Sequence, residues 1–210
     1  MDDPEERPEE FRIDSVYLAM IVEGGLILVA LSAGWLLTVD PLATLRWTPE
    51  DLPLHGAALG WGVLAALPLL GAMLLTYRFP VGPLGRLRRL VEETVVPMFR
   101  GAGVVELALI SLLAGVGEEL LFRGLLQAAL AGWIGGPLGA WIAIAAASLV
   151  FGLCHAVSRT YFVLATLISV YLGLLFVWTG NLLAPMAAHA VYDFLALAYL
   201  LYLRRGADST

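Results

Sequence analysis

Long apolar stretches restrict this chain to a membrane more firmly than any other feature of its sequence. Hydrophobic residues make up 60% of the 210 positions and charged residues only 14%, whereas soluble domains carry roughly 25% charged residues. A transmembrane helix needs about 20 consecutive apolar residues. Stretches of that length, separated by connections with proline, glycine or arginine, are Val16–Val39, Leu54–Tyr77, Val104–Ala131, Leu138–His155, Tyr161–Trp178 and Leu182–Leu203. The sequence therefore predicts an all-α, polytopic bundle of about six transmembrane helices.

Charged residues outside these stretches predict the domain organisation and the topology. Seven of the 18 acidic residues precede residue 15, which predicts an acidic, disordered tail over residues 1–14. A single transmembrane domain is expected over residues 15–205, with a short C-terminal tail over residues 206–210. The arginines of the connections fall on one side of the membrane except Arg46, so both termini are expected in the cytoplasm. Lysine is absent while arginine, alanine and leucine abound, which suggests a GC-rich bacterial genome and hence a bacterial inner membrane.

Composition also argues against two other classes of protein. The arginines lie between apolar runs and form no basic face, so the expected surroundings are a lipid bilayer and not a nucleic acid. The single cysteine, Cys154, excludes an intramolecular disulfide framework and is expected to be a buried small apolar residue.

A segment between the second and third apolar stretches has an amphipathic pattern. Leu84, Leu87 and Leu90 recur at helical spacing, while Arg86 and Arg89 occupy other faces. This pattern indicates an interfacial helix on the cytoplasmic surface. A solvated basic loop accounts for the same residues equally well.

Ionisable side chains within the apolar stretches are few and grouped. Each costs on the order of 2.5–3.5 kcal/mol to bury in hydrocarbon, so each calls for a partner or a function. Three of the stretches hold most of them: Glu118, Glu119, Arg123, His155, His189 and Asp193. Glu23, which precedes two glycines, fits a helix kink with local water and, less readily, a substrate or gating role.

The two adjacent glutamates of the third stretch differ in whether a cationic partner lies on the same helical face. Glu119 and Arg123 are four residues apart, so they share a helical face and can neutralise each other. Glu118 points about 100° away and lacks that partner. Glu118 is therefore the candidate general base. The alternative is an ion-paired helix whose second carboxylate faces a wet crevice.

The two histidines complete a candidate site. His189 and Asp193 are one helical turn apart, and a carboxylate at that spacing can fix an imidazole tautomer or share a water or a metal with it. One unpaired glutamate and two histidines on three helices match what is needed to hold and activate a water molecule. Residue counting puts His155 near the cytoplasmic end of its helix and His189 nearer the opposite side. They can therefore meet only if the Ala156–Thr160 connection is sunk into the protein.

Three short motifs carry a resemblance to a known family. Glu118-Glu119-Leu-Leu-Phe-Arg123, Phe151-Gly-Leu-Cys-His155 and His189-Ala-Val-Tyr-Asp193 follow one another on apolar stretches. They resemble the Glu-Glu-x-x-x-Arg, Phe-x-x-x-His and His-x-x-x-Asn/Asp motifs of the CAAX protease and bacteriocin-processing family of intramembrane proteases. The chain is thus similar to type II CAAX prenyl endopeptidases, with a family-like catalytic core at residues 104–201.

The resemblance implies a reaction and a role for each residue. The reaction would be hydrolysis of a peptide or protein tail within the membrane, the partner being a prenylated CAAX-like protein or a peptide precursor. Glu118 would activate the water, His155 and His189 would bind that water or a metal, and Asp193 would complete the site.

For the roles of the remaining motif residues and for the cofactor, the resemblance leaves alternatives open. Glu119 and Arg123 would pair to hold the helix, or Arg123 would meet a substrate carboxylate. A bound metal would be zinc, held by Glu118, His155, His189 and Asp193. A metal-free mechanism with a glutamate-activated water is the other possibility.

Two functions of other classes stay open at this point. One is a catalytically silent immunity or scaffold protein, in which the same buried residues only pack. The other is a proton-coupled transporter, because buried glutamates and histidines also build proton relays. No internal repeat is evident, which weighs against a transporter. The oligomeric state is not predicted.

Overall fold

A computed structural model of the chain describes residues 8–203, and their backbone is helical apart from the connections. No strand occurs between residues 8 and 203, so the predicted all-α fold class is confirmed. The α-helices and the π-helical segments, labelled η, are α1 Pro8–Leu37, α2 Leu52–Arg78, α3 Gly82–Leu90, η1 Val91–Val95, α4 Val96–Phe99, α5 Val104–Glu119, η2 Leu120–Gln127, α6 Ala128–Ile134, α7 Gly136–Cys154, α8 Arg159–Thr179, α9 Leu183–Ala198 and η3 Tyr199–Leu203.

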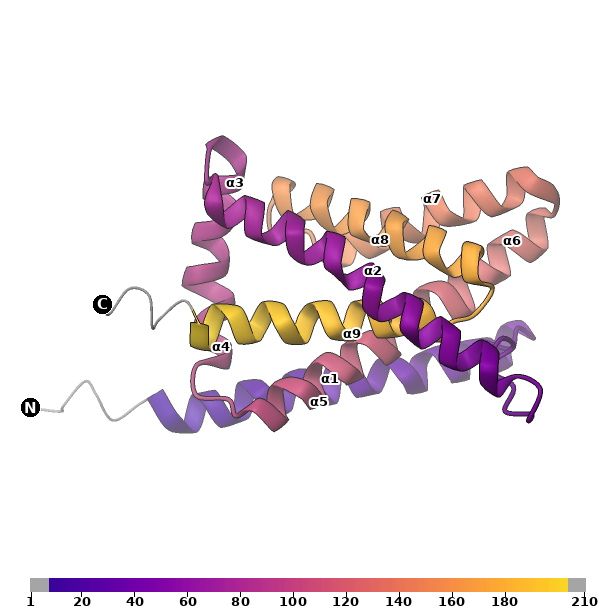
Figure 1. The fold of residues 1–210 in the computed structure, drawn as a ribbon, viewed down its shortest axis with the longest axis horizontal. Helices are drawn as coiled ribbons and strands as arrows, with labels where there is room; N and C mark the ends of the chain where they lie inside the picture. The colour runs from indigo at the N-terminus through magenta and orange to yellow at the C-terminus, as the bar shows by residue number, and fades with distance from the viewer. Residues whose placement is uncertain (1–7, 204–210) are drawn as a thin grey trace, which may run out of the picture.

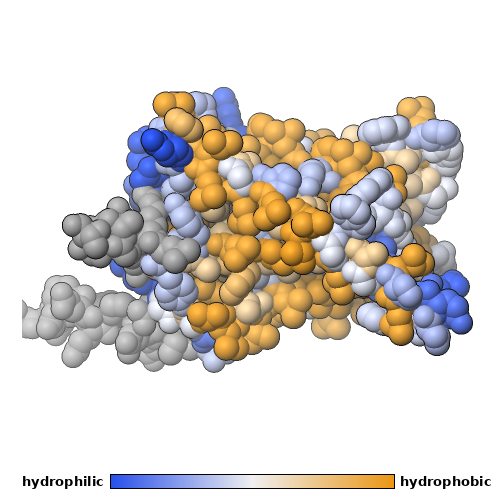
Figure 2. All heavy atoms as spheres, viewed as in Figure 1, coloured by the Kyte–Doolittle hydropathy of each residue, from blue (hydrophilic) through white to orange (hydrophobic). Residues whose placement is uncertain are grey.

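Five stretches of helix are long and apolar enough to cross a membrane, and they match five of the six predicted spans. They are Ser15–Leu37, Leu52–Arg78, Gly136–Cys154, Arg159–Thr179 and Leu183–Tyr202. The third predicted span is helical throughout, but α5, η2 and α6 follow one another within it and the geometry changes to π-helical at its centre. A broad apolar belt covers the face of the molecule between more polar ends (Figure 2). The chain is an integral membrane protein of several helices.

The predicted tails lie largely at or beyond the limits of the described residues. Helix α1 begins at Pro8, so the second half of the acidic tail predicted over residues 1–14 is helical. Residues 1–7 and the C-terminal tail at 206–210 lie outside the described residues.

Helix α9 occupies the centre of the bundle. It packs extensively on α2 and on α5, and it also contacts α8, while α1 covers α5 and α7 pairs with α8. In Figure 1, α1 and α5 lie along one side, α7 and α8 along the other, and α9 runs between them. The helix that carries His189 and Asp193 is therefore surrounded by the other spans.

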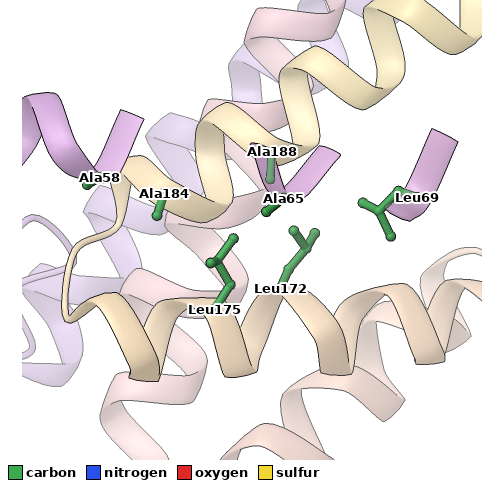
Figure 3. Packing of buried hydrophobic residues seen from close by; sticks show 7 residues of the cluster. All are labelled: Ala58, Ala65, Leu69, Leu172, Leu175, Ala184 and Ala188. Carbon is green, nitrogen blue, oxygen red and sulfur yellow. The ribbon is translucent and has the colours of Figure 1, made fainter. Parts of the chain in front are cut away.

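Small residues permit this close packing around α9. Ala58 and Ala65 of α2 and Ala184 and Ala188 of α9 form a buried cluster with leucines of α8, which point into it (Figure 3). At the crossing of α5 and α9, a Cβ on Gly115 would lie 2.8 Å from the backbone nitrogen of Ala190. Because helices in lipid associate through close backbone approach, these positions set how α9 sits.

The amphipathic segment predicted between the second and third spans is a helix. It forms α3, in which Leu87 is buried while Arg86 and Arg89 are exposed. Helix α3 lies across one end of the bundle and not along it (Figure 1). The prediction of a helix is confirmed, and the alternative of a basic loop is wrong.

The turn between α7 and α8 stops short of the bundle end that α1 and α9 reach (Figure 1). Helix α7 ends at Cys154 and α8 begins at Arg159. The Ala156–Thr160 connection is therefore set inward along the bundle, as a shared histidine site requires, but it is not covered by protein, because Ala156, Val157 and Arg159 are exposed. Cys154 itself is exposed, so the prediction that it is buried is wrong.

Candidate active site

A buried ion pair anchors the candidate site at the end of α5. Glu119 Oε1 accepts a hydrogen bond from Arg123 Nη1 at 2.9 Å, and both side chains are fully buried. The second guanidinium nitrogen, Nη2, donates to the carbonyl oxygen and the hydroxyl of Ser169 on α8, at 2.7 and 2.8 Å. The Arg123 guanidinium also lies 5.3 Å from the centre of the Phe151 ring. The predicted pairing is confirmed, and it joins the third span to α7 and α8.

The same glutamate fixes the orientation of His189. Glu119 Oε1 lies 2.8 Å from His189 Nδ1, and because a carboxylate can only accept, the Nδ1–H donates. His189 Nε2 then faces two other carboxylates, Asp193 Oδ2 at 3.4 Å and Glu118 Oε2 at 3.9 Å. Glu119 therefore serves two partners, of which the sequence predicted only Arg123.

His155 is oriented from the opposite side, at the C-terminal end of α7. Its Nδ1 lies 2.9 Å from the carbonyl oxygen of Phe151, and a carbonyl only accepts, so this nitrogen carries the proton. The imidazole stacks on the Phe151 ring at 4.4 Å with an interplanar angle of 16°. His155 Nε2 consequently points inward, 3.7 Å from Glu118 Oε1.

Glu118 lies between the two histidines. Its side chain is buried, with 6% of the residue exposed, and its Oε2 has no hydrogen-bond partner among the described residues. The distances of 3.7 and 3.9 Å to the two Nε2 atoms exceed a hydrogen bond. They are short enough for one water molecule to lie among the three groups and donate hydrogen bonds to two of them. The structure thus brings together Glu118, His155, His189 and Asp193 as the sequence predicted.

A further carboxylate reaches this centre from α1. Glu23 lies near Glu118, with His189 and Asp193 also close to it. Helix α1 approaches α5 closely here because Gly117 presents no side chain to the carbonyl oxygen of Glu23. The sequence analysis did not place Glu23 in the site. Its only signal was a charged residue inside an apolar stretch.

The donor chemistry of the centre suits zinc, but its geometry does not fit a bound ion as it stands. Two imidazole nitrogens and the carboxylates of Glu118 and Asp193 are ordinary zinc ligands, and both histidines are held through their other nitrogen. Nevertheless, between residues 8 and 203 no group of three or more His, Cys, Asp or Glu side chains is arranged to hold a metal ion.

Comparisons with known proteins bear on the same part of the chain. Residues 100–195 match the Rce1-like family, described as type II CAAX prenyl endopeptidase Rce1-like. This region contains every predicted site residue and lacks Glu23. The Bacillus subtilis protein named "Uncharacterized protein YpbD" is 36% identical over 99 residues. That alignment covers 46% of this chain and 46% of the relative, so the chain matches about half the length of that protein.

No solved structure matches the chain. The resemblance that the three motifs indicated is confirmed by the family match. Residues 100–195, from just before the third span to near the end of α9, are similar to the Rce1-like family of type II CAAX prenyl endopeptidases.

Proposed function

We propose that this protein is an intramembrane endopeptidase that cuts a peptide or protein tail. The observation that carries the proposal is the convergence of Glu118 with His155 Nε2 and His189 Nε2 at 3.7 and 3.9 Å. These groups lie in the region that matches an endopeptidase family. A buried carboxylate beside two oriented imidazoles can activate a water molecule. This arrangement favours a hydrolase over a silent scaffold or a proton-coupled transporter.

In the proposed reaction, Glu118 acts first as base and then as acid. A water bridging Glu118 and the two Nε2 atoms gives one proton to Glu118 while its oxygen attacks the carbonyl carbon of the scissile peptide bond. The tetrahedral intermediate collapses as the C–N bond breaks, and Glu118 returns the proton to the leaving amine. One water is consumed, and the products are a carboxylate and an amine.

The other polar residues position these groups. Glu119 and Arg123 hold His189 through the Nδ1 bond and tie α5 to α8. Asp193 lies on the same helix as His189, with its Oδ2 3.4 Å from His189 Nε2, and it adds a negative charge beside that imidazole. In this proposal the Glu119–Arg123 pair is a support for the site, because Arg123 is fully buried and its donors are directed at Glu119 and Ser169.

The placement of the arginines predicts the orientation of the protein in its membrane. We propose a bacterial inner membrane with both termini in the cytoplasm, since the arginines of the connections gather on one side. The substrate would be a membrane-bound peptide or protein, either prenylated near its C-terminus or a peptide precursor. No nucleic acid takes part in this proposal.

Zinc is the alternative way of activating the water. A bound ion would act as a Lewis acid on that water, and Glu118, His155, His189 and Asp193 would have to move closer together to hold it. Treatment with a chelator separates the two versions. Activity that survives the chelator supports the metal-free reaction, and loss that zinc restores supports a metalloenzyme.

The decisive experiment is cleavage of a fluorogenic peptide library, with prenylated members, by detergent-purified protein. Glu118→Gln and His189→Ala are compared with the wild type. Glu93→Gln is the matched control, because Glu93 is an exposed glutamate in η1, away from the site. Cleavage that disappears in the two site variants and persists in the control supports the proposal. Undiminished cleavage by Glu118→Gln, or no cleavage of any peptide by the wild type, contradicts it.

A further inference from the structure

A polar hollow lies at the end of the bundle opposite α3, away from the candidate active site. It has a volume of about 610 Å³ and is formed by the α1–α2 connection, the start of α2 and the α8–α9 turn. Its polar lining includes Arg46, Asp51, His55 and Asn181. None of these residues belongs to the family-like motifs.

Hydrogen bonds between distant parts of the chain build the wall of this hollow. His55 is buried, and its two ring nitrogens lie 2.8 Å from the carbonyl oxygen of Arg46 and 2.8 Å from the amide nitrogen of Asn181. The backbone N–H of Leu182 donates to the hydroxyl of Thr44. Because both His55 nitrogens are engaged, this histidine is a structural element of the wall and leaves the charged groups at the rim to meet a ligand.

An apolar groove continues from the polar hollow along the surface of the bundle. The groove has a volume of about 430 Å³ and shares Trp61 and Trp178 with the hollow. The two tryptophans meet edge to face, with ring centres 5.1 Å apart. From Trp178 the groove reaches Tyr171, seven residues or about 10 Å along α8. There the Tyr171 hydroxyl donates to the carbonyl oxygen of Ala65 and bridges α2 and α8.

The groove exists because α2 and α8 both pack on α9 while their backbones stay apart, so that only side chains such as Tyr171 and the two tryptophans join them. Figure 3 shows Leu172 and Leu175 of α8 pointing toward Ala184 and Ala188 of α9, with Ala65 of α2 close to them. The groove itself is lined by residues of α2 and α8 only, and most of them are apolar. Tryptophans favour the depth at which lipid headgroups begin, so the hollow lies at headgroup depth and the groove at acyl-chain depth.

The geometry points to a binding site for one diacyl phospholipid with a zwitterionic headgroup, its phosphate at Arg46, its amine at Asp51 and an acyl chain in the groove. Charge complementarity selects this occupant. Arg46 is the one arginine among the described residues at this end and is exposed, and of the nearby acidic residues Asp40, Glu50 and Asp51 only Asp51 lines the hollow. An anionic headgroup without an amine would offer no cation to the Asp51 carboxylate, which within the protein accepts a hydrogen bond from the Thr48 hydroxyl. This inference is independent of the proposed peptidase activity.

The test is native mass spectrometry of the delipidated, detergent-purified protein. The protein is offered equal amounts of dioleoyl phosphatidylethanolamine, dioleoyl phosphatidylglycerol and dioleoylglycerol. The expected result is a one-to-one adduct in which phosphatidylethanolamine predominates. Arg46→Gln should lower that adduct roughly tenfold, because it removes a charge-assisted contact to the phosphate. Asp51→Asn removes the negative charge with little change of shape and should abolish the preference over phosphatidylglycerol; the Asp51 side chain makes no cap hydrogen bond at the start of α2 that the change could break.

Two further variants separate a built site from lipid that merely surrounds the protein. Arg89→Gln removes an exposed arginine at the opposite end, on α3, and should leave the adduct unchanged. Leu174→Trp places a bulky ring in the groove and should lower binding of all three lipids, with circular dichroism confirming that the variant is folded. Equal retention of the three lipids, an Arg46→Gln effect no larger than that of Arg89→Gln, or retention of peptide substrate but no phospholipid would each overturn the inference.

Discussion

Two ion pairs of the same spacing and length occupy opposite environments, and their comparison tests how the site is held together. Glu119 and Arg123 are 2.9 Å apart with side chains 0% and 1% exposed. Arg88 and Glu92 are also 2.9 Å apart and four residues apart, but their side chains are 29% and 31% exposed. Each arginine also lies near an aromatic ring, Phe151 or Tyr77. Burial is the main difference between the pairs.

Replacing each arginine by methionine removes the charge and keeps most of the length. Arg123→Met leaves the Glu119 carboxylate buried without its cation, which should destabilise the protein by about 3–5 kcal/mol. Arg88→Met removes a partner of a Glu92 side chain that already has access to solvent, so the expected loss is about 0.2–1 kcal/mol. The difference between the two losses reports the cost of stranding a buried charge together with the two Arg123 hydrogen bonds to Ser169.

The free energy of unfolding can be measured by titrating the protein in mild-detergent micelles with sodium dodecyl sulfate. The double variant Glu119→Gln/Arg123→Met should be more stable than the sum of its single variants predicts, by about 0.5–3 kcal/mol, because the two groups interact directly. Glutamine at position 119 can still accept the bond from His189. If Arg123→Met costs no more than Arg88→Met, or if the double variant is simply additive, the pair does not anchor the site.

Three further predictions concern α1, the α1–α5 crossing and the end of α7. Glu23→Ala should lower kcat for peptide cleavage roughly tenfold, because a hydrogen bond to a charged group is worth about 1.5–3 kcal/mol. Glu23→Gln should keep most of the activity, since glutamine can still form a hydrogen bond. Equal losses of activity in the two variants would exclude a positioning role by hydrogen bonding. Gly117→Val should destabilise the protein by about 1–3 kcal/mol in the same unfolding titration, since a side chain there meets the carbonyl oxygen of Glu23; unchanged stability would mean that the crossing is loose. Cys154 is exposed, so a membrane-permeant maleimide should label the native protein at one thiol; labelling only after denaturation would place Cys154 in the interior.

Much of the candidate site could be predicted because helical spacing is local. The pairing of Glu119 with Arg123, and the proximity of His189 to Asp193, follow from a separation of four residues on one helix. The inward connection after His155 also followed, since the two histidines could not otherwise share a centre. These predictions needed only the period of the helix and the cost of burying charge.

Spacing along one helix could not predict the contacts between different helices. Nothing in the spacing indicated that His189 Nδ1 would bond to Glu119, or that Arg123 would reach Ser169 on α8. Glu23 was interpreted mainly as a helix kink with local water because two glycines follow it, and Cys154 was expected inside because its neighbours are apolar. In a membrane protein an apolar stretch faces lipid as readily as it faces the core, so hydrophobicity alone does not tell the two sides apart.

The sequence by itself determined that this chain spans a membrane as an all-α bundle, and which charged side chains had to be accommodated inside it. The free energy of moving apolar and ionisable groups between water and hydrocarbon depends on residue type and length, which can be read along the chain. Only the tertiary structure decided how the helices are rotated and how deeply each is set. Those depend on close contacts such as Gly115 with Ala190 and Gly117 with Glu23. They bring Glu23, Glu118 and the two histidines to one centre, and they leave the groove between α2 and α8 open.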